Sequence, residues 1–501
     1  MKDKATKILK AVCFCILAVL MTLHITRLFT PKWLNSWDAC RVESTFYTLD
    51  RDSVDVLFMG SSCGAAGIDP FQLYSEYGIS SYNLNADQQT VLGVYYWLRE
   101  ALKTQSPRLV VVEVTAVGIK AAKVDKVARR SYDHMNWGIN KIQYALEYHD
   151  SGEMEVSLIS YLFPLYMYHS RWSELTYEDY EFTYGAMMLQ TRGFRPHTDV
   201  FKNENPGSPW TGYEGFSPDD DAEAEYIDSN IDALEDIIGL CEEKGIKLLL
   251  YKSMDSGWNA GLYNIVKTVA DEHGVPYVDM NLTENAADSG IVFGEDANDR
   301  RHMNTRGTKK TTAYIGQYIN NNYDLPDRRD DEEFSAEMAE EGVQYGFIME
   351  NMESRYITDL TEYLENAAGW ERYAVIAAGK GFAMEFTEAQ KESLKELGIP
   401  EEVIAAAEAG DRVVCVFGST EVPVFASGTE NASEASGTLS DGSVYRISTD
   451  DEKVSVIVNE KERRVSGSGL NVVIYDTAAG EAADRFRISF NEEDGRIYLD
   501  R

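Results

Sequence analysis

Between about residues 52 and 325, short runs of consecutive apolar residues alternate with longer amphipathic stretches. Continuous apolar runs predict strands that are buried on both faces, as in parallel sheets. The predicted strands are 54–59, 81–84, 109–114, 246–251 and 275–279. Amphipathic stretches such as 90–104 predict the helices between them. The alternation predicts an α/β domain with a flavodoxin-like, doubly wound parallel sheet, whose site lies at the carboxyl ends of the strands.

The stretch 121–220 interrupts this alternation and is rich in aromatic residues. Its densest mixture of polar and aromatic side chains is Tyr168-His169-Ser170-Arg171-Trp172. One interpretation is an insertion that caps the active site and stacks aromatic rings on sugars. The other is a helical subdomain whose aromatic residues form a core of their own. The sequence leaves both interpretations open.

The N-terminal residues predict a membrane anchor. Several lysines precede an apolar run that extends, with interruptions, over residues 11–29. A membrane-spanning helix needs about 20 residues, and residues 8–29 provide that length if Lys10 and Arg27 reach toward the two interfaces. No small-residue cleavage motif follows. We therefore predict an uncleaved signal anchor over residues 1–31 rather than a cleaved signal peptide. Its basic end stays inside, which places the bulk of the chain outside the cytoplasm, at the cell membrane.

The pattern of predicted strands and helices changes after an acidic stretch, 326–354, which we predict to be a linker. Residues 355–501 combine short strand patterns, two helix patterns and a loop rich in small residues, 427–438. The predicted strands are 373–378, 413–417, 443–448, 454–458, 470–475 and 486–490, and the predicted helices are 355–367 and 385–397. This mixture predicts a second domain of the α+β or β-sandwich type.

Length, charge and cysteine content exclude several function classes. The 501 residues suffice for about two domains. The chain carries 83 Asp and Glu against 47 Lys and Arg, a formal net charge of −36. We do not expect nucleic acid as a partner, because phosphates require cationic contacts. Two of the six cysteines, Cys13 and Cys15, lie in the predicted membrane segment. The other four show no Cys-x-x-Cys pair and no histidine at metal-ligand spacing, so the sequence predicts no disulfide framework and no metal site.

A short turn, Gly60-Ser61-Ser62, directly follows the first predicted strand and can present a serine hydroxyl at the edge of the sheet. Such a hydroxyl needs a base within hydrogen-bond reach, and the base needs a third group that fixes its tautomer. His302 is the candidate base and Asp299 the candidate orienting group. Ser62 is the better nucleophile candidate because it starts the segment after the turn. This chemistry needs no metal or organic cofactor.

These motifs resemble those of the SGNH/GDSL hydrolase superfamily. The resemblance is carried by residues 56–62 and 82–84 and by the motif Asp299-x-x-His302-Met303-Asn304-x-x-Gly307, and it covers about 52–325. More closely, the chain is similar to membrane-anchored, extracytoplasmic SGNH-like proteins of bacteria, whose relatives modify cell-envelope polymers with acyl groups. The resemblance implies catalytic roles for Ser62, Asp299 and His302. The stretch 168–172 is also similar to one in such relatives, which makes Tyr168, His169, Arg171 and Trp172 substrate-binding candidates.

The sequence departs from the superfamily pattern around the expected oxyanion site. The usual aspartate before the nucleophile is Ser61 here, and the usual Gly-x-Asn-Asp block after the third strand is missing. The candidate oxyanion donors are therefore the backbone N–H groups of Ser62 and Asn85 and the side chain of Gln89 or Gln88. One such donor typically contributes about 10²–10³ in rate, so its loss distinguishes a fast enzyme from a slow or inactive one.

The C-terminal region resembles the interleukin-like EMT inducer (ILEI) domain over about 355–501. The motif that carries the resemblance is Ser466-x-Ser468-Gly469-Leu470-Asn471, followed by an apolar strand. Relatives of that module in glycan-processing proteins bind carbohydrate, so the resemblance implies a sugar-binding role. A purely structural or interaction module remains an open alternative.

Two functional hypotheses follow from the sequence. The first is an extracytoplasmic serine esterase or O-acyltransferase that acts on acyl esters of a cell-surface polysaccharide or other glycan, and is held at the membrane by its N-terminal helix. The second is a non-catalytic cell-envelope protein that uses an SGNH fold to bind a glycan or a protein. The incomplete oxyanion motifs keep the second hypothesis open.

Overall fold

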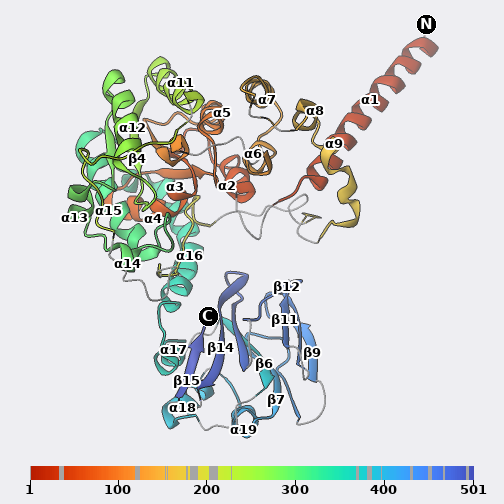
Figure 1. Cartoon of the computed structure of the whole chain (residues 1–501). Helices are drawn as coiled ribbons and strands as arrows, with labels where there is room; N and C mark the ends of the chain where they lie inside the picture. Colours follow the sequence, from red (N-terminus) through yellow and green to blue (C-terminus); the bar gives the residue numbers. More distant parts are fainter. Residues whose placement is uncertain are drawn as a thin grey trace. The chain divides into compact units, whose positions relative to one another are not determined.

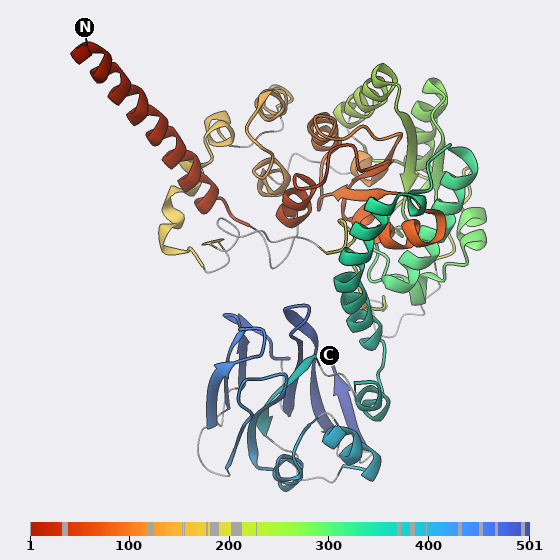
Figure 2. The same ribbon diagram turned by 180° about the vertical axis from the view of Figure 1, so that it is seen from behind.

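The computed structural model describes residues 2–32, 39–118, 125–152, 154, 156–176, 179–180, 190–201, 213–226, 228–367, 372–380, 386–396, 398–428, 433–449, 454–465, 469–491 and 496–501. The chain divides into two compact units, Met1–Ala339 and Glu340–Arg501. Figures 1 and 2 show the elements from opposite sides. Each unit has its own sheet structure and its own apolar core.

A five-stranded parallel sheet organises the first unit (Figure 1). Its strands are β1 (Val56–Gly60), β2 (Ser81–Asn85), β3 (Leu109–Glu113), β4 (Lys247–Lys252) and β5 (Tyr277–Asp279). They lie in the order β2-β1-β3-β4-β5, which is the flavodoxin-like order of doubly wound sheets. The α/β alternation predicted from the sequence is therefore present.

Helices cover both faces of this sheet because its strands are apolar on both sides. One face, which includes Leu57 and Val110, packs against α5 (Val91–Ala101), α11 (Asp228–Lys244) and α12 (Ala260–His273). The opposite face, which includes Phe58 and Val111, packs against α4 (Pro70–Tyr77) and α15 (Thr305–Asn322). Further elements of this unit are α2 (Ala39–Phe46), α3 (Ser62–Gly67), η1 (Val114–Gly118), α6 (Asp125–Tyr132), α7 (Ile139–Asp150), α8 (Leu158–Leu162), α9 (Leu165–Tyr168), η3 (His169–Ser173), α13 (Thr283–Ser289), α14 (Phe293–Asp296) and η4 (Arg328–Asp330).

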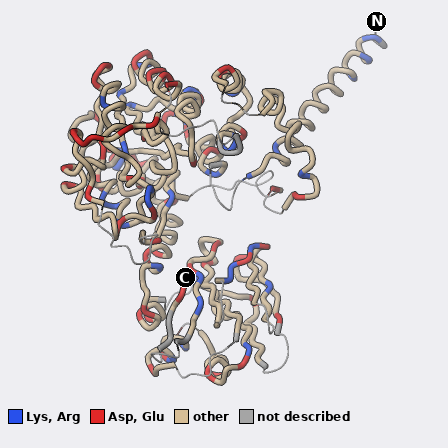
Figure 3. Tube along the Cα trace, viewed as in Figure 1, with Lys and Arg blue, Asp and Glu red and all other residues tan. Residues whose placement is uncertain are grey.

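The N-terminal helix α1 (Lys2–Phe29) is apolar along most of its length. Its segment Lys4–Phe29 has a mean hydropathy of 2.4 in its most apolar window, and that window is not buried in the protein. The helix is therefore long and apolar enough to span a membrane, a test that an N-terminal signal sequence also passes. Figure 3 shows that most of this helix carries no Lys, Arg, Asp or Glu, and that basic residues lie at its start.

The second unit is built from two antiparallel sheets and a layer of helices. The larger sheet has the order β15-β14-β13-β6-β7-β8, and the smaller one has the order β12-β11-β10-β9. The sheets pack face to face through residues such as Ile376, Val414, Ile447 and Val456. The strands are β6 (Tyr373–Lys380), β7 (Arg412–Gly418), β8 (Val424–Gly428), β9 (Ser433–Thr438), β10 (Val444–Thr449), β11 (Val454–Val458), β12 (Lys461–Glu462), β13 (Leu470–Asp476), β14 (Glu481–Asn491) and β15 (Arg496–Asp500). Helices α17 (Leu360–Ala367), α18 (Glu388–Glu396) and α19 (Glu401–Ala409) contribute to the core on the other face of the larger sheet.

Three segments differ from the sequence prediction. The stretch expected to be an acidic linker is mostly a helix, α16 (Glu332–Ser354), because its acidic first turn suits a helix start and Asp331 Oδ1 accepts a hydrogen bond from Phe334 N at 3.2 Å. Phe334 and Met338 are buried, so an apolar stripe lies within the acidic composition. In the second unit, α19 was not predicted, and part of the predicted small-residue loop is β9.

The glycine at the end of β1 provides a test of the close contact between β1 and β3. Gly60 has a φ of +147°, and a Cβ added there would lie 2.6 Å from the carbonyl oxygen of Glu113. We expect Gly60→Ala to lower the free energy of unfolding by about 2 kcal/mol or more, through backbone strain and overlap. Gly239, inside α11, has no heavy atom within 4 Å of its added Cβ, so Gly239→Ala should raise it by about 0.5–1 kcal/mol.

Both variants can be measured by thermal unfolding of the full chain in detergent with tryptophan fluorescence. Tryptophan is a suitable probe because all but Trp370 of the tryptophans precede residue 340. Equal effects of the two alanine substitutions would contradict the tight contact between Gly60 and β3.

Candidate active site

The candidate nucleophile lies at the sharp turn between β1 and α3. Ser61 is the N-cap of α3, and its Oγ accepts a hydrogen bond from Cys63 N at 3.3 Å. The Ser61 hydroxyl in turn donates to Glu113 Oε2 at 2.8 Å. Ser61 is buried, whereas Ser62 is partly exposed. The turn therefore fixes one serine inside the protein and presents the next one at the carboxyl edge of the sheet.

The structure brings Ser62, His302 and Asp299 together. The Nε2 atom of His302 lies 2.8 Å from Ser62 Oγ, although the two residues are 240 positions apart in the sequence. On the other side of the ring, Nδ1 lies 2.8 Å from Asp299 Oδ2 and 3.0 Å from Oδ1. Both contacts are within hydrogen-bond distance. This is the order of nucleophile, base and orienting carboxylate that a serine-based acyl transfer requires.

The electrostatics of Asp299 favour its orienting role. Partial burial raises the pKa of its carboxyl, but the hydrogen bond and charge of His302 and the N–H groups of Arg301 and His302 lower it well below its usual range. The two N–H groups donate to Oδ1 at 2.8 Å and 3.0 Å. An ionised Asp299 favours a proton on His302 Nδ1, which leaves Nε2 free to accept the proton of Ser62.

The oxyanion candidates are only partly in place. Asn85 pairs with Gly60 across β1 and β2, and its Oδ1 lies 2.6 Å from where a Cβ on Gly64 would be. The side chain of Asn85 therefore lies against the short helix that begins at Ser62. Gln89 is also buried. Within the described residues, the side-chain nitrogen and oxygen of both amides are buried without a hydrogen-bond partner, and their oxyanion role stays a prediction.

Three of the four predicted substrate-binding residues make contacts within the insertion or with α1, and the fourth is exposed. The Tyr168 hydroxyl donates to Asp133 Oδ2 at 2.6 Å, and His169 Nδ1 lies 2.9 Å from the Tyr166 carbonyl oxygen. Arg171 donates to the carbonyl oxygen of Phe29, at the end of α1, at 2.5 Å, and to Asp179 Oδ2 at 3.1 Å. Trp172 is 72% exposed. These contacts join Tyr168 and Arg171 to the rest of the insertion and to α1.

Sequence reasoning missed a second group of residues around His302. The ring centroid of His197 lies 5.9 Å from that of His302. Asp87 forms an ion pair with Arg195. Burial raises the pKa of the Asp87 carboxyl, and the charges of Arg195 and His302 oppose that shift. These residues come from the loop before α5 and from the end of the aromatic insertion, whose sequences carry no motif that relates them to the site.

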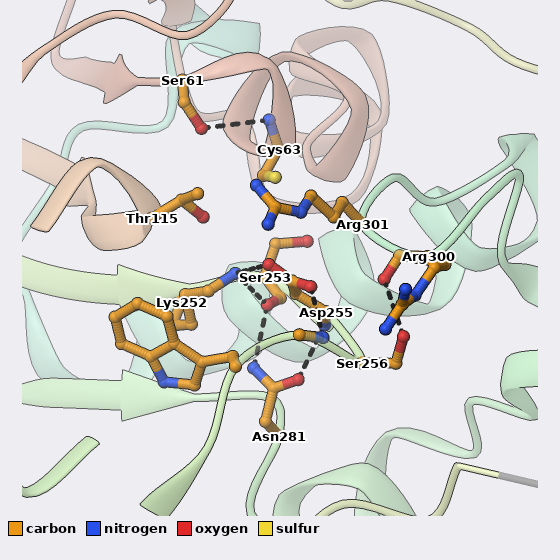
Figure 4. A network of polar contacts seen from close by, with 12 residues as sticks. Ser61, Cys63, Thr115, Lys252, Ser253, Asp255, Ser256, Asn281, Arg300 and Arg301 are labelled. Atoms are coloured by element: carbon orange, nitrogen blue, oxygen red, sulfur yellow. Dashed lines mark hydrogen bonds and ion pairs between the residues drawn. The ribbon is translucent and has the colours of Figure 1, made fainter. Parts of the chain in front are cut away.

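A buried charged network lies below the nucleophile turn (Figure 4). The Lys252 ammonium has no exposed surface and lies 3.5 Å from Glu113 Oε1 and 3.6 Å from Asp255 Oδ2. It also donates to the Ser253 carbonyl oxygen at 2.8 Å. Burial lowers the pKa of Lys252, but the two carboxylates outweigh burial and raise it. Because Glu113 accepts the hydrogen bond of Ser61, the lysine neutralises the group that holds the nucleophile turn.

The same network reaches the turn that carries the base. Asp255 N donates to Asn281 Oδ1 at 2.7 Å, and Asp255 Oδ1 accepts from Gly257 N at 2.7 Å. The next residue, Ser256, donates its N–H to the carbonyl oxygen of Arg300 at 2.9 Å. One chain of polar contacts thus joins Ser61 to the loop that contains Asp299 and His302. The sequence held a signal for this network, since β3, β4 and β5 each end at a charged residue, namely Glu113, Lys252 and Asp279.

Comparison with known proteins places few constraints on this site. No protein-family model and no curated protein matches the chain. A crystal structure described as "a putative acylhydrolase" from Bacteroides fragilis is similar over 58% of this chain and 98% of its own length, with 15% sequence identity and a TM-score of 0.28. The class of protein is therefore argued from the geometry of the chain itself, a doubly wound α/β unit with a Ser–His–Asp arrangement at the carboxyl edge of its sheet.

The lysine network predicts a charge-dependent loss of stability. Lys252→Met leaves Glu113 and Asp255 without their buried counter-charge, which should lower the free energy of unfolding by about 3–5 kcal/mol. Adding Glu113→Gln removes one uncompensated carboxylate and should recover part of that loss. The matched control is Lys247→Met at the exposed start of the same strand, which should have little effect. Chemical unfolding of the full chain measures all three, and equal stability of the two methionine variants would contradict the network.

The half-buried ring of His197 predicts a dependence of stability on pH. Burial, followed by the charges of Arg195 and His302, lowers its pKa from the ordinary 6.5 to about 3. Below pH 6.5 the unfolded chain binds a proton here that the folded chain does not, so the free energy of unfolding falls as the pH falls toward 3. The slope from this group is at most about 1.4 kcal/mol per pH unit.

His197→Gln should remove that contribution, whereas His149→Gln, at an exposed histidine, should leave the slope unchanged. Urea unfolding between pH 6.5 and pH 4 provides the measurement. An unchanged slope in His197→Gln would show that the ring takes up its proton in the folded protein.

Proposed function

We propose that this chain is a membrane-anchored serine esterase or O-acyltransferase of the SGNH type. The observation that carries the proposal is the 2.8 Å contact between Ser62 Oγ and His302 Nε2, with Asp299 on the opposite ring nitrogen. The strand order, with Ser62 directly after β1 and His302 beyond β5, fits that superfamily, as do the sequence motifs quoted above. The location, with α1 in the membrane and the site outside the cytoplasm, is part of the same proposal.

In the proposed reaction, His302 Nε2 takes the proton of Ser62 while Oγ attacks the carbonyl carbon of an acyl ester. The tetrahedral intermediate collapses with cleavage of the ester C–O bond, and the leaving alcohol takes the proton from His302. The acyl group then remains on Ser62. Water or a sugar hydroxyl, deprotonated by His302, attacks this acyl-enzyme and releases the serine. Water as acceptor gives an esterase, and a sugar hydroxyl gives an acyltransferase.

We further propose that the ester is carried by a cell-surface glycan. This part rests on the resemblance of the first unit to extracytoplasmic proteins that acylate envelope polymers, and on the resemblance of residues 355–501 to the ILEI domain. The two packed antiparallel sheets of the second unit are compatible with a carbohydrate-binding module. The first part of its sequence motif, 466–468, lies outside the described residues.

One observation favours the second candidate function, a non-catalytic binding protein. The Gly-x-Asn-Asp block that the superfamily carries after the third strand is missing from this sequence. Without preorganised donors, formation of the oxyanion costs several kcal/mol more. A protein that lacks them would contain the Ser–His pair without catalysing acyl transfer.

Covalent labelling distinguishes the two candidates. The full chain in detergent is treated with a fluorophosphonate, whose phosphorus loses fluoride and forms a phosphonate ester with a serine only where a base activates that serine. We expect labelling in the wild type and its loss in Ser62→Ala and His302→Ala. Ser75→Ala, at an exposed serine of α4, is the matched control and should label normally. Absence of labelling in the wild type, or persistence in Ser62→Ala, would reject the proposed mechanism.

A further inference from the structure

The short helices of the aromatic insertion are apolar on two sides. Tyr161 and Tyr168 point into the protein and are 1% and 7% exposed. Five other large apolar side chains of the same segment remain exposed, with fractions between 43% and 72%. These five, here called the outer apolar patch, are Ile159, Phe163, Tyr166, Met167 and Trp172. Exposed apolar side chains concentrated in this way mark a surface that contacts something other than water.

The patch is also nearly free of charge. Between residues 157 and 173, Arg171 is the sole Lys, Arg, Asp or Glu, although such residues make up 26% of the chain. The guanidinium of Arg171 is engaged by the Phe29 carbonyl oxygen and by Asp179. A partner that recognises this surface therefore cannot rely on ion pairs and must be apolar or interfacial itself.

The position of the patch follows from its contacts with α1. Both α9 and η3 contact that helix, and the views in Figures 1 and 2 agree on this neighbourhood. Side chains 4–24 of α1 are exposed along its length, whereas most of residues 25–30 are partly or fully covered. The hydrogen bond from Arg171 to Phe29 fixes η3 at the end of the apolar segment. The patch thus lies beside the point where the helix would leave a bilayer.

We propose that the outer apolar patch is a second membrane contact, which lies in the headgroup and upper acyl region of the bilayer that α1 spans. The inference rests on the proposed membrane insertion of α1 and is independent of the catalytic proposal. Tyrosine and tryptophan concentrate at that depth because their rings are amphipathic, and a helix that lies in the interface plane buries its apolar face at the boundary between headgroups and acyl chains. The patch lies next to the end of α1, so lipid would surround it if α1 spans a bilayer. This position favours lipid over a protein or glycan as the partner.

Attachment to the membrane through both α1 and the outer apolar patch would restrict the orientation of the first unit more than attachment through α1 alone. A single helix leaves the attached unit free to tilt about its end, whereas the patch adds a contact on one side of that end. The Arg171–Asp179 pair and the Tyr168–Asp133 hydrogen bond link this surface to the rest of the insertion. Arg192 and Arg195, near the end of the insertion, contact the Ser81 carbonyl oxygen and Asp87. The insertion would then hold the Ser62 region at a set orientation to the membrane surface.

Photo-crosslinking of the full chain in lipid vesicles tests this proposal. The variants Tyr166→p-benzoylphenylalanine and Trp172→p-benzoylphenylalanine place a photoreactive ketone in the patch. Leu17→p-benzoylphenylalanine does so inside α1, and Val292→p-benzoylphenylalanine is the matched control. Val292 is an exposed apolar residue of the same unit, directly before α14 and remote from α1 (Figure 1). After illumination, mass spectrometry of the peptides identifies lipid adducts.

We expect lipid adducts at positions 17, 166 and 172 and none at 292. Adducts at 17 without adducts at 166 and 172 would overturn the second contact while leaving the membrane helix in place. Protein adducts in place of lipid at 166 and 172 would also overturn it. Absence of lipid at 17 would reject membrane insertion of α1, and the inference with it. None of these outcomes depends on fluorophosphonate labelling, so failure of the catalytic proposal remains distinguishable.

Discussion

The ammonium of Lys252, completely buried between two carboxylates, is the interaction on which the candidate site depends. A lone buried charge is expensive in an apolar interior, so the lysine and its partners Glu113 and Asp255 are compatible with folding only together. Their mutual attraction fixes the carboxyl ends of β3 and β4 at one spacing. Glu113 passes this constraint to β1 through the hydrogen bond from Ser61. The position of Ser62 is therefore set by electrostatics two strands away as well as by its own turn.

The base reaches Ser62 by a different route that ends at the same strands. The loop after α14 returns to the sheet edge, where Ser256 N binds the Arg300 carbonyl oxygen and Asn298 N binds that of His302. Asp299 then closes a tight turn by accepting two backbone N–H groups while its carboxylate holds the imidazole. Parallel strands bring such loops to one edge, which is why residues far apart in sequence meet there. The contact between Ser62 and His302 therefore depends on both the parallel sheet and the buried network around Lys252.

The sequence predicted the parts of this arrangement that depend on local patterns. The five strands of the first unit were recognisable because continuous apolar runs bounded by turns have few alternatives, and Ser62, Asp299 and His302 stood out by residue type and order. The Lys252 network was not predicted, because pairing between strand ends depends on strand order. Helix α16 was read as a linker, since acidic composition hid the buried stripe of Phe334 and Met338. The surroundings of His302, with Asp87 and His197, come from loops without periodicity.

The aromatic insertion shows where a sequence pattern is ambiguous for a physical reason. Aromatic side chains at close spacing can fill a core, stack on sugars or lie at a membrane interface, because each environment accepts a large ring with one polar edge. Exposure separates these cases: Tyr161 and Tyr168 fill a core, whereas Tyr166 and Trp172 remain at the surface. Arg171, predicted from the sequence as a substrate-binding residue, donates to the carbonyl oxygen of Phe29 at the end of the apolar helix. An α-helix has unpaired carbonyl oxygens in its last turn, so the guanidinium of Arg171 both pairs one of them and attaches the insertion to the helix.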